Sequence, residues 1–220
     1  MDPLTNLLLL CLFLGGILLM GCWKLGGGLL SLPARIIRDA KPAKWSLMDF
    51  LHLQSNRPKS SSTFIFREES IRSLGHRYAG RFDFAILHWE EAPVLDAIVE
   101  RKFPLKHLPS KPRPPDVFQA GLYALALMES GVSCSSTRLF LIYCLQESAS
   151  RCIGKNEAEC LTCGEKAMFV RRFRPEVVLR GLRKLDEVWY RGRKPRATPN
   201  ASKCKACPYA RDGSCRYSPL

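Results

Sequence analysis

The sequence is poor in acidic residues and has no internal repeat. Asp and Glu number 20 against 34 Lys and Arg, which gives a formal net charge of +14 at pH 7. Such an excess suits a polyanionic partner, because bound phosphates displace condensed counterions. A solvated helix surface or a contact with anionic lipid would suit it as well, and charge alone does not separate the three. The length of 220 residues suits one domain with appendages.

Positive charge is also missing before the long apolar run at the start of the chain. Residues 7–23 read LLLLCLFLGGILLMGCW, and the apolar stretch can be extended to residues 4–31. A cleavable signal peptide normally begins with positive charge, and MDPLTN has none, so we expect residues 1–32 to be retained as a membrane anchor with one transmembrane helix. Lys and Arg follow the run, at positions 24, 35, 38, 41 and 44. By the positive-inside tendency, the protein is predicted to be single-pass, with its carboxy-terminal domain in the cytoplasm.

Charged residues interrupt two strand-like segments of the middle region. The segment PVLDAIVERK, residues 93–102, ends in Glu100 and Lys102, which leave the same face of an extended strand. The segment YAGRFDFAIL, residues 78–87, carries Asp83 between two phenylalanines, where an unpaired carboxylate would be costly to bury. Glu100 and Lys102 alone would suit a weak exposed ion pair. Side by side, however, the two strands would bring Asp83, Glu100 and Lys102 together.

Two carboxylates at one place repel each other unless a divalent cation lies between them, and a nearby lysine can orient a water molecule on that metal. This combination favours hydrolysis of a phosphodiester. A helix expected over residues 116–130 adds Gln119 and Tyr123, which are four apart and therefore lie on one face. Taken alone, Tyr123 could equally be a core aromatic residue and Gln119 a helix-surface residue.

The series GRFDFAIL, VERK and QAGLYALAL resembles the D, E-x-K and Q-x-x-x-Y motifs of the RecB-like PD-(D/E)XK nucleases. The resemblance implies that Asp83, Glu100 and the main-chain carbonyl of Arg101 hold one or two Mg²⁺ or Mn²⁺ ions. It implies that Lys102 positions the attacking water, and that Gln119 and Tyr123 orient the substrate strand or the lysine. RecB-like nucleases often add a histidine as a metal ligand, for which His52 is the first candidate and His76 the second.

The end of the chain resembles the CRISPR-associated RecB-type exonucleases in particular. The segment KCKACPYARDGSC contains Cys204, Cys207 and Cys215, and the resemblance implies that they bind a 4Fe-4S cluster. Two departures are visible: the gap before Cys215 is longer than the family pattern, and no cysteine lies between residues 22 and 134 to act as the early ligand. Cys160 or Cys163 can supply the missing ligand, and paired C-x-x-C motifs also suit Zn²⁺. A secreted disulfide scaffold fits this chain length and these pairs badly.

The expected architecture is an α/β fold with a restriction-endonuclease-like core, a mixed β-sheet flanked by helices, and one preceding transmembrane helix. We expect the anchor in residues 1–32, a linker and short helix in 33–62, the nuclease core in 63–194 and a cysteine cap in 195–220. Strands are predicted in residues 64–68, 78–87, 93–102, 138–145 and 167–173, and a late helix in residues 175–192.

The expected function is that of a membrane-anchored, metal-dependent deoxyribonuclease. The resemblance implies an exonuclease that prefers single strands or ends of DNA, with CRISPR adaptation or repair proteins as partners. One alternative is a membrane-tethered nucleic-acid-binding module without catalysis, and another is a protein whose basic face meets acidic lipid. Neither alternative by itself requires Asp83, Glu100 and Lys102 together.

Overall fold

The computed structural model describes residues 36–53, 58–59, 62–152, 163–194 and 197–219. The chain divides into two compact units with the boundary between Val178 and Leu179, and each unit is described by itself. The expected membrane anchor, residues 1–32, lies outside the described residues. Among the helices that the structure describes, none is long and apolar enough to cross a bilayer.

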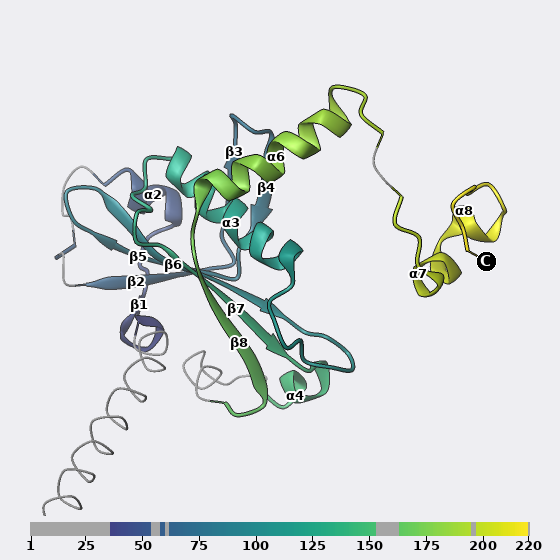
Figure 1. The fold of residues 1–220 in the computed structure, drawn as a ribbon. Helices are drawn as coiled ribbons and strands as arrows, with labels where there is room; N and C mark the ends of the chain where they lie inside the picture. Colours follow the sequence, from purple (N-terminus) through teal and green to yellow (C-terminus); the bar gives the residue numbers. More distant parts are fainter. Residues whose placement is uncertain (1–35, 54–57, 60–61, 153–162, 195–196, 220) are drawn as a thin grey trace, which may run out of the picture. The chain divides into compact units, whose positions relative to one another are not determined.

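Six strands of the first unit form one mixed sheet, in the order β1-β2-β5-β6-β7-β8 (Figure 1). Their bounds are β1 Lys41–Pro42, β2 Thr63–Arg67, β5 Phe84–Trp89, β6 Pro93–Lys102, β7 Arg138–Cys144 and β8 Lys166–Arg172. β1 is parallel to β2 and β6 is parallel to β7, whereas the other neighbouring pairs are antiparallel. The predicted α/β class and the mixed sheet with flanking helices are confirmed.

The helices are α2 Leu47–Leu51, α3 Pro114–Glu129, α4 Gln146–Ser150 and α6 Pro175–Trp189, followed in the second unit by α7 Ala201–Ala206 and α8 Pro208–Arg211. α3 connects the parallel strands β6 and β7, which a short turn cannot join. Its first residues are prolines, and Gly131 follows its end with a φ of 88°. Proline fits the first turn of a helix, where its missing N–H is not needed, and glycine readily adopts the left-handed backbone after a helix. The local sequence therefore defines both ends of α3.

A second sheet has two strands, β3 Ser70–Ser73 and β4 Tyr78–Arg81, which form an antiparallel hairpin. In the sequence, this hairpin lies between β2 and β5. The hairpin packs against α3, where the Tyr78 hydroxyl donates a 2.8 Å hydrogen bond to the Leu122 carbonyl. The single strand expected over residues 78–87 was therefore wrong: this segment is divided between β4 and β5. The alternation of apolar residues continues through the break, because Phe82 is buried there, and so the pattern does not reveal that the segment changes partners.

The two faces of the large sheet are covered by different elements. On one face, eight buried residues form an apolar cluster around the central strands: Ile37, Ile65, Phe84, Ile86, Ala97, Val99, Phe140 and Ile142. The segment before β1 contributes Ile37 to this cluster. Side chains alternate along β6, so Ile98, Glu100 and Lys102 leave the opposite face, where α3 packs. The active-site candidates therefore lie on the face that α3 covers.

α2 is the described helix that lies within residues 33–62, where a linker and a short helix were expected, and β1 precedes it. Phe50 of α2 is completely buried and contacts three aromatic rings of the sheet, those of Phe64, Phe66 and Trp89, at 5.8, 5.1 and 5.4 Å between ring centroids. Burial of this ring anchors the short helix, which is too short to be stable alone.

His88 links the two central strands through charge. Its Nδ1 lies 2.8 Å from Asp96 Oδ2 on β6, and its Nε2 lies 3.1 Å from Glu90 Oε1. Burial by itself would lower the pKa of His88, but the hydrogen bonds and charges of Glu90 and Asp96 outweigh it, so the pKa is raised.

We expect His88→Gln to destabilise the protein at low pH more than at high pH. A folded-state pKa above the unfolded value gives stability that is fully present below the unfolded pKa and is lost as pH rises through the folded pKa. Urea unfolding of wild type and variant at pH 5.5 and pH 9 measures the difference. His107→Gln is the control, because His107 is exposed and forms no ion pair within the described residues. A stability difference that does not shrink with rising pH would contradict the prediction.

Candidate active site

Five predicted site residues meet where β5, β6 and α3 converge. The register of the antiparallel pair places Phe84 opposite Val99, so Asp83 stands opposite the end of β6. The main-chain N–H of Arg101 donates a 2.5 Å hydrogen bond to Asp83 Oδ2. This bond holds the Asp83 carboxylate against the strand that carries Glu100 and Lys102.

A chain of hydrogen bonds joins the end of β6 to α3. Lys102 Nζ donates to Glu100 Oε1 at 2.7 Å and to Gln119 Oε1 at 2.8 Å. Gln119 Nε2 in turn donates to the Tyr123 hydroxyl at 2.8 Å. The i, i+2 spacing on a strand and the i, i+4 spacing on a helix produce this chain, since each puts its two side chains on one face. The structure thus links Glu100, Lys102, Gln119 and Tyr123 in one chain of hydrogen bonds, and the bond from the Arg101 N–H places Asp83 beside it.

Glu100 is the most deeply buried charged residue of this network, with 4% of its surface exposed. Its Oε1 accepts from Lys102, but its Oε2 is buried without a hydrogen-bond partner among the described residues. Burial raises the pKa of Glu100, and the charge of Asp83 raises it further against the opposing effect of Lys102. A buried carboxylate oxygen without a partner is costly, so this atom is where the site would accept a cation.

Lys102 remains a strong cation in this setting. Burial lowers its pKa, but the hydrogen bond and charge of Glu100, together with the charges of Asp116 and Asp83, outweigh burial and raise the pKa. The lysine is therefore protonated at neutral pH and can donate hydrogen bonds but cannot accept a proton. Any role for it in chemistry is electrostatic or positional.

Sequence reasoning missed Asp116, which lies in the first turn of α3. Its Oδ2 accepts a 2.7 Å hydrogen bond from the hydroxyl of the fully buried Tyr143, and its charge acts on both Glu100 and Lys102. The signal was present, because Asp116, Gln119 and Tyr123 are spaced i, i+3 and i+7 and share a face of α3. The site thus contains a third carboxylate within electrostatic reach.

The two candidate histidines lie elsewhere. His52 follows the end of α2, and its Nδ1 is 2.7 Å from the Met48 carbonyl. His76 lies in the turn of the β3–β4 hairpin, where its Nε2 is 3.3 Å from Glu129 Oε1. Across the part of the chain that the structure describes, no three His, Cys, Asp or Glu side chains are close enough together to hold a metal ion. Neither histidine therefore joins Asp83 and Glu100 in such a group.

The cysteines of the second unit lie in or next to two short helices. Cys204 lies in α7, Cys207 separates α7 from α8, and Cys215 follows α8, and all three are free thiols. They too form no metal-binding group within the described residues. Cys163 precedes β8, where its Sγ accepts from the Glu165 N–H at 3.3 Å, and Cys160 lies outside the described residues. Cys160 and Cys163 belong to the first unit, and their expected role as further ligands stays a prediction.

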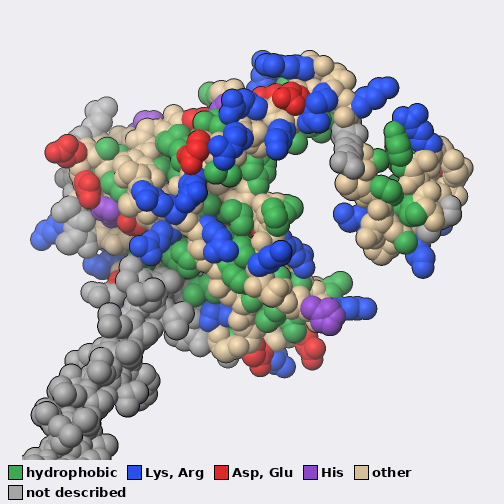
Figure 2. All heavy atoms as spheres, viewed as in Figure 1, with side chains coloured by type: hydrophobic (Ala, Val, Ile, Leu, Met, Phe, Trp, Pro, Cys, Tyr) green, Lys and Arg blue, Asp and Glu red, His purple; other side chains and the backbone are tan. Residues whose placement is uncertain are grey.

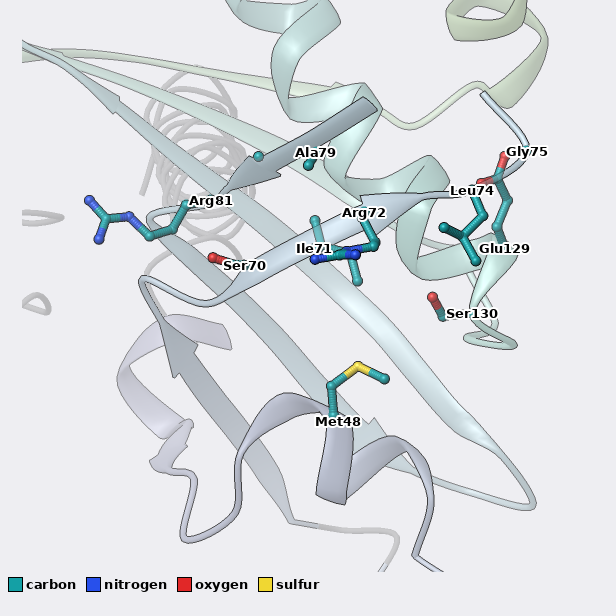
Figure 3. A pocket seen from close by; sticks show the side chains of 11 residues that line it. Met48, Ser70, Ile71, Arg72, Leu74, Gly75, Ala79, Arg81, Glu129 and Ser130 are labelled. Atoms are coloured by element: carbon teal, nitrogen blue, oxygen red, sulfur yellow. The ribbon is translucent and has the colours of Figure 1, made fainter. Parts of the chain in front are cut away.

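A hollow of about 1220 Å³ adjoins the network on the hairpin side. The hairpin, the end of α3 and Met48 of α2 line it, and Figure 3 shows Arg72, Ile71 and Met48 around the space. Gly80 of β4 also lines the hollow, and a Cβ at this position would lie 2.7 Å from Tyr123 Cε1. The absence of a side chain at Gly80 therefore gives Tyr123 the room it occupies beside Gln119.

A scan of protein-family models found no match to the chain, and a search of curated proteins found no relative.

Proposed function

We propose that the chain is a metal-dependent nuclease of the PD-(D/E)XK type, with a restriction-endonuclease-like core, that hydrolyses phosphodiester bonds in DNA. One observation carries the proposal: the buried Glu100 Oε2, without a partner among the described residues, lies in the same network as Lys102 and next to the Asp83 position. A structural ion pair would be expected to satisfy both oxygens of so deeply buried a carboxylate. A cation-binding site, in contrast, would leave one carboxylate oxygen available for the ion.

The donor set fits a small divalent cation. Asp83 and Glu100 supply carboxylate oxygens, and the main-chain carbonyl of Arg101 between Glu100 and Lys102 is the further ligand that the family resemblance implies. Oxygen ligands suit Mg²⁺ and Mn²⁺, which keep several water molecules and so need few protein ligands. When bound, such an ion acidifies a water molecule and offsets the charge of the phosphate. The repulsion that raises the pKa of Glu100 would be offset in the same way.

Lys102 would then hold the attacking water and stabilise negative charge on the phosphate. Its ammonium group is fixed on two sides, by Glu100 Oε1 and by Gln119 Oε1, and it has one donor left for water or phosphate. Gln119 is itself fixed by Tyr123. A cation held in this way needs no rearrangement when charge develops, which is the condition for efficient electrostatic stabilisation.

The proposed iron–sulfur or zinc site enters no step of this mechanism, because the mechanism uses only residues of the first unit. Metal analysis of protein purified without oxygen tests the site independently of nuclease activity. From the family resemblance, we also propose single strands or ends of DNA as substrate and a membrane-anchored setting.

Cleavage is expected to require a divalent cation. The full chain, kept in neutral detergent and purified without oxygen, should cut labelled single-stranded DNA in Mg²⁺ or Mn²⁺ and should stop when EDTA removes the ion. Gel analysis of single- and double-stranded substrates labelled at either end gives substrate and polarity together. Folded protein that binds DNA and never cuts it in either metal would replace the nuclease with a nucleic-acid-binding module.

A further inference from the structure

A second hollow of the first unit, of about 590 Å³, lies beside the first half of α3. We name it the basic hollow. The residues lining it come from the segment before α3, from α3, from β7, from the end of β8 and from the start of α6: Lys111, Pro112, Pro114, Val117, Phe118, Leu139, Arg171, Arg172, Arg174, Val177 and Val178. These segments are far apart in the sequence, so no single motif marks the hollow.

Four cations line the basic hollow, and no carboxylate does: Lys111, Arg171, Arg172 and Arg174. All four residues are exposed, and within the described residues none of them forms an ion pair. The hydrogen bonds of two of them go to main-chain carbonyls, from Arg171 to Val170 and from Arg172 to Ser135. Like charges around one depression repel each other, so an anion in the basic hollow would relieve this repulsion.

The floor of the basic hollow is apolar. Val117 and Phe118 of α3 line it together with Leu139 of β7, and Phe118 is only partly buried. A basic rim around an apolar, aromatic floor has the composition of sites that take single-stranded nucleic acid, where cations hold the phosphates and aromatic rings stack on bases. A lipid headgroup would use the rim but would leave the ring of Phe118 without a stacking partner.

The basic hollow and the candidate active site share helix α3, which contributes neighbouring residues to each. Phe118 and Gln119 are consecutive on α3, so they project about 100° apart around the same helix. In the view of Figure 2, Lys and Arg side chains are spread over the unit that carries the sheet, and acidic side chains are few. A strand bound in the basic hollow would therefore lie on a helix face next to the one that contributes Gln119 and Tyr123.

We propose that the basic hollow binds the phosphodiester backbone of a single strand of nucleic acid and holds it for the site at Lys102. The identity of this polyanion rests on the proposed nuclease function, whereas the charge and shape of the hollow do not. The phosphates would contact the rim, Arg171 and Arg174 in particular, and a base would stack on Phe118. The basic hollow is then a binding surface that acts before chemistry.

The test is the affinity of the full chain for a fluorescent single-stranded oligonucleotide, measured by anisotropy in EDTA at several salt concentrations. The variant is Arg171→Gln with Arg174→Gln. Loss of two phosphate contacts should make the negative slope of log K against log salt shallower by about 1.4, at about 0.7 per contact, which is a loss of about 25-fold in affinity near 0.1 M salt. Phe118→Ala should weaken binding without changing the slope.

The matched control is Lys41→Gln with Lys44→Gln, which removes the same charge at β1, the edge of the sheet opposite β8. Equal losses in both double variants would mean general charge attraction and would overturn the proposal. An unchanged affinity in the Arg171 and Arg174 variant, with cleavage intact, would overturn it and leave the nuclease function standing. If the Arg171 and Arg174 variant lost binding to anionic vesicles but kept its affinity for the oligonucleotide, the basic hollow would be assigned to lipid instead. Normal oligonucleotide binding without any cleavage would reject the nuclease alone.

Discussion

Replacement of Glu100 by Gln is expected to remove DNA cleavage and to leave the protein folded. Gln has the same shape and keeps an oxygen that can accept from Lys102 Nζ, but it lacks the negative charge that would hold a cation beside Asp83. Loss of one preorganised electrostatic group typically costs a reaction about 100- to 1000-fold. The variant exchanges the unpartnered buried oxygen for an uncharged amide group and so removes the cost of burying a charge, and we expect the unfolding temperature to stay within a few degrees of wild type.

The measurement combines the rate of cleavage in Mg²⁺ or Mn²⁺ with thermal unfolding. Glu91→Gln is the matched control, because Glu91 is exposed in the turn between β5 and β6. Lys102→Gln should lose activity to a similar degree, because it removes the cation that Glu100 and Gln119 hold in place. If Glu100→Gln cuts DNA at the wild-type rate, Glu100 and Lys102 are a structural ion pair and the proposed function fails.

The shared faces of the candidate site residues were easier to predict than the strand pairings around them, because the spacings of these residues are local. Side chains two residues apart on a strand share a face, and so do side chains four residues apart on a helix. This holds whatever the strand or helix packs against. Glu100 and Lys102, and likewise Gln119 and Tyr123, follow from this rule. That Asp83 stands opposite Glu100 required only that two neighbouring strands pair with each other, which is common for consecutive strands.

Features that depend on contacts between distant segments were not visible in the sequence. The division of residues 78–87 between β4 and β5 depends on which strand each half pairs with, and the alternation of apolar residues is the same in either case. The burial of Glu100 depends on α3, and the basic hollow depends on five separate segments. Such features are determined by tertiary packing, and local patterns in the sequence do not show which distant segments pack together.

Gly80 is the clearest of these unforeseen features, and it leads to the second large effect. We expect Gly80→Ala to reduce cleavage by about 100-fold, the order of loss that a misplacement of about 1 Å causes in a catalytic site. The new Cβ would lie 2.7 Å from Tyr123 Cε1 and 3.4 Å from the Tyr123 hydroxyl oxygen. Tyr123 would have to shift, and the shift would also disturb its contact with Phe82, whose ring centroid lies 6.2 Å away.

The shift of Tyr123 would break its hydrogen bond with Gln119 and so loosen the support of Lys102. The turnover number should therefore fall more than the apparent affinity for DNA, because the phosphate-binding residues of the basic hollow are not touched. Gly75→Ala, in the turn of the same hairpin, is the control, since its Cβ would meet only Glu129 Oε1 at 4.0 Å. Overpacking costs about 1–3 kcal/mol, so thermal unfolding must show that Gly80→Ala is still folded at the assay temperature. A folded Gly80→Ala protein with the activity of Gly75→Ala would show that the Tyr123–Gln119 chain does not position Lys102, and catalysis would then rest on the two carboxylates and the lysine alone.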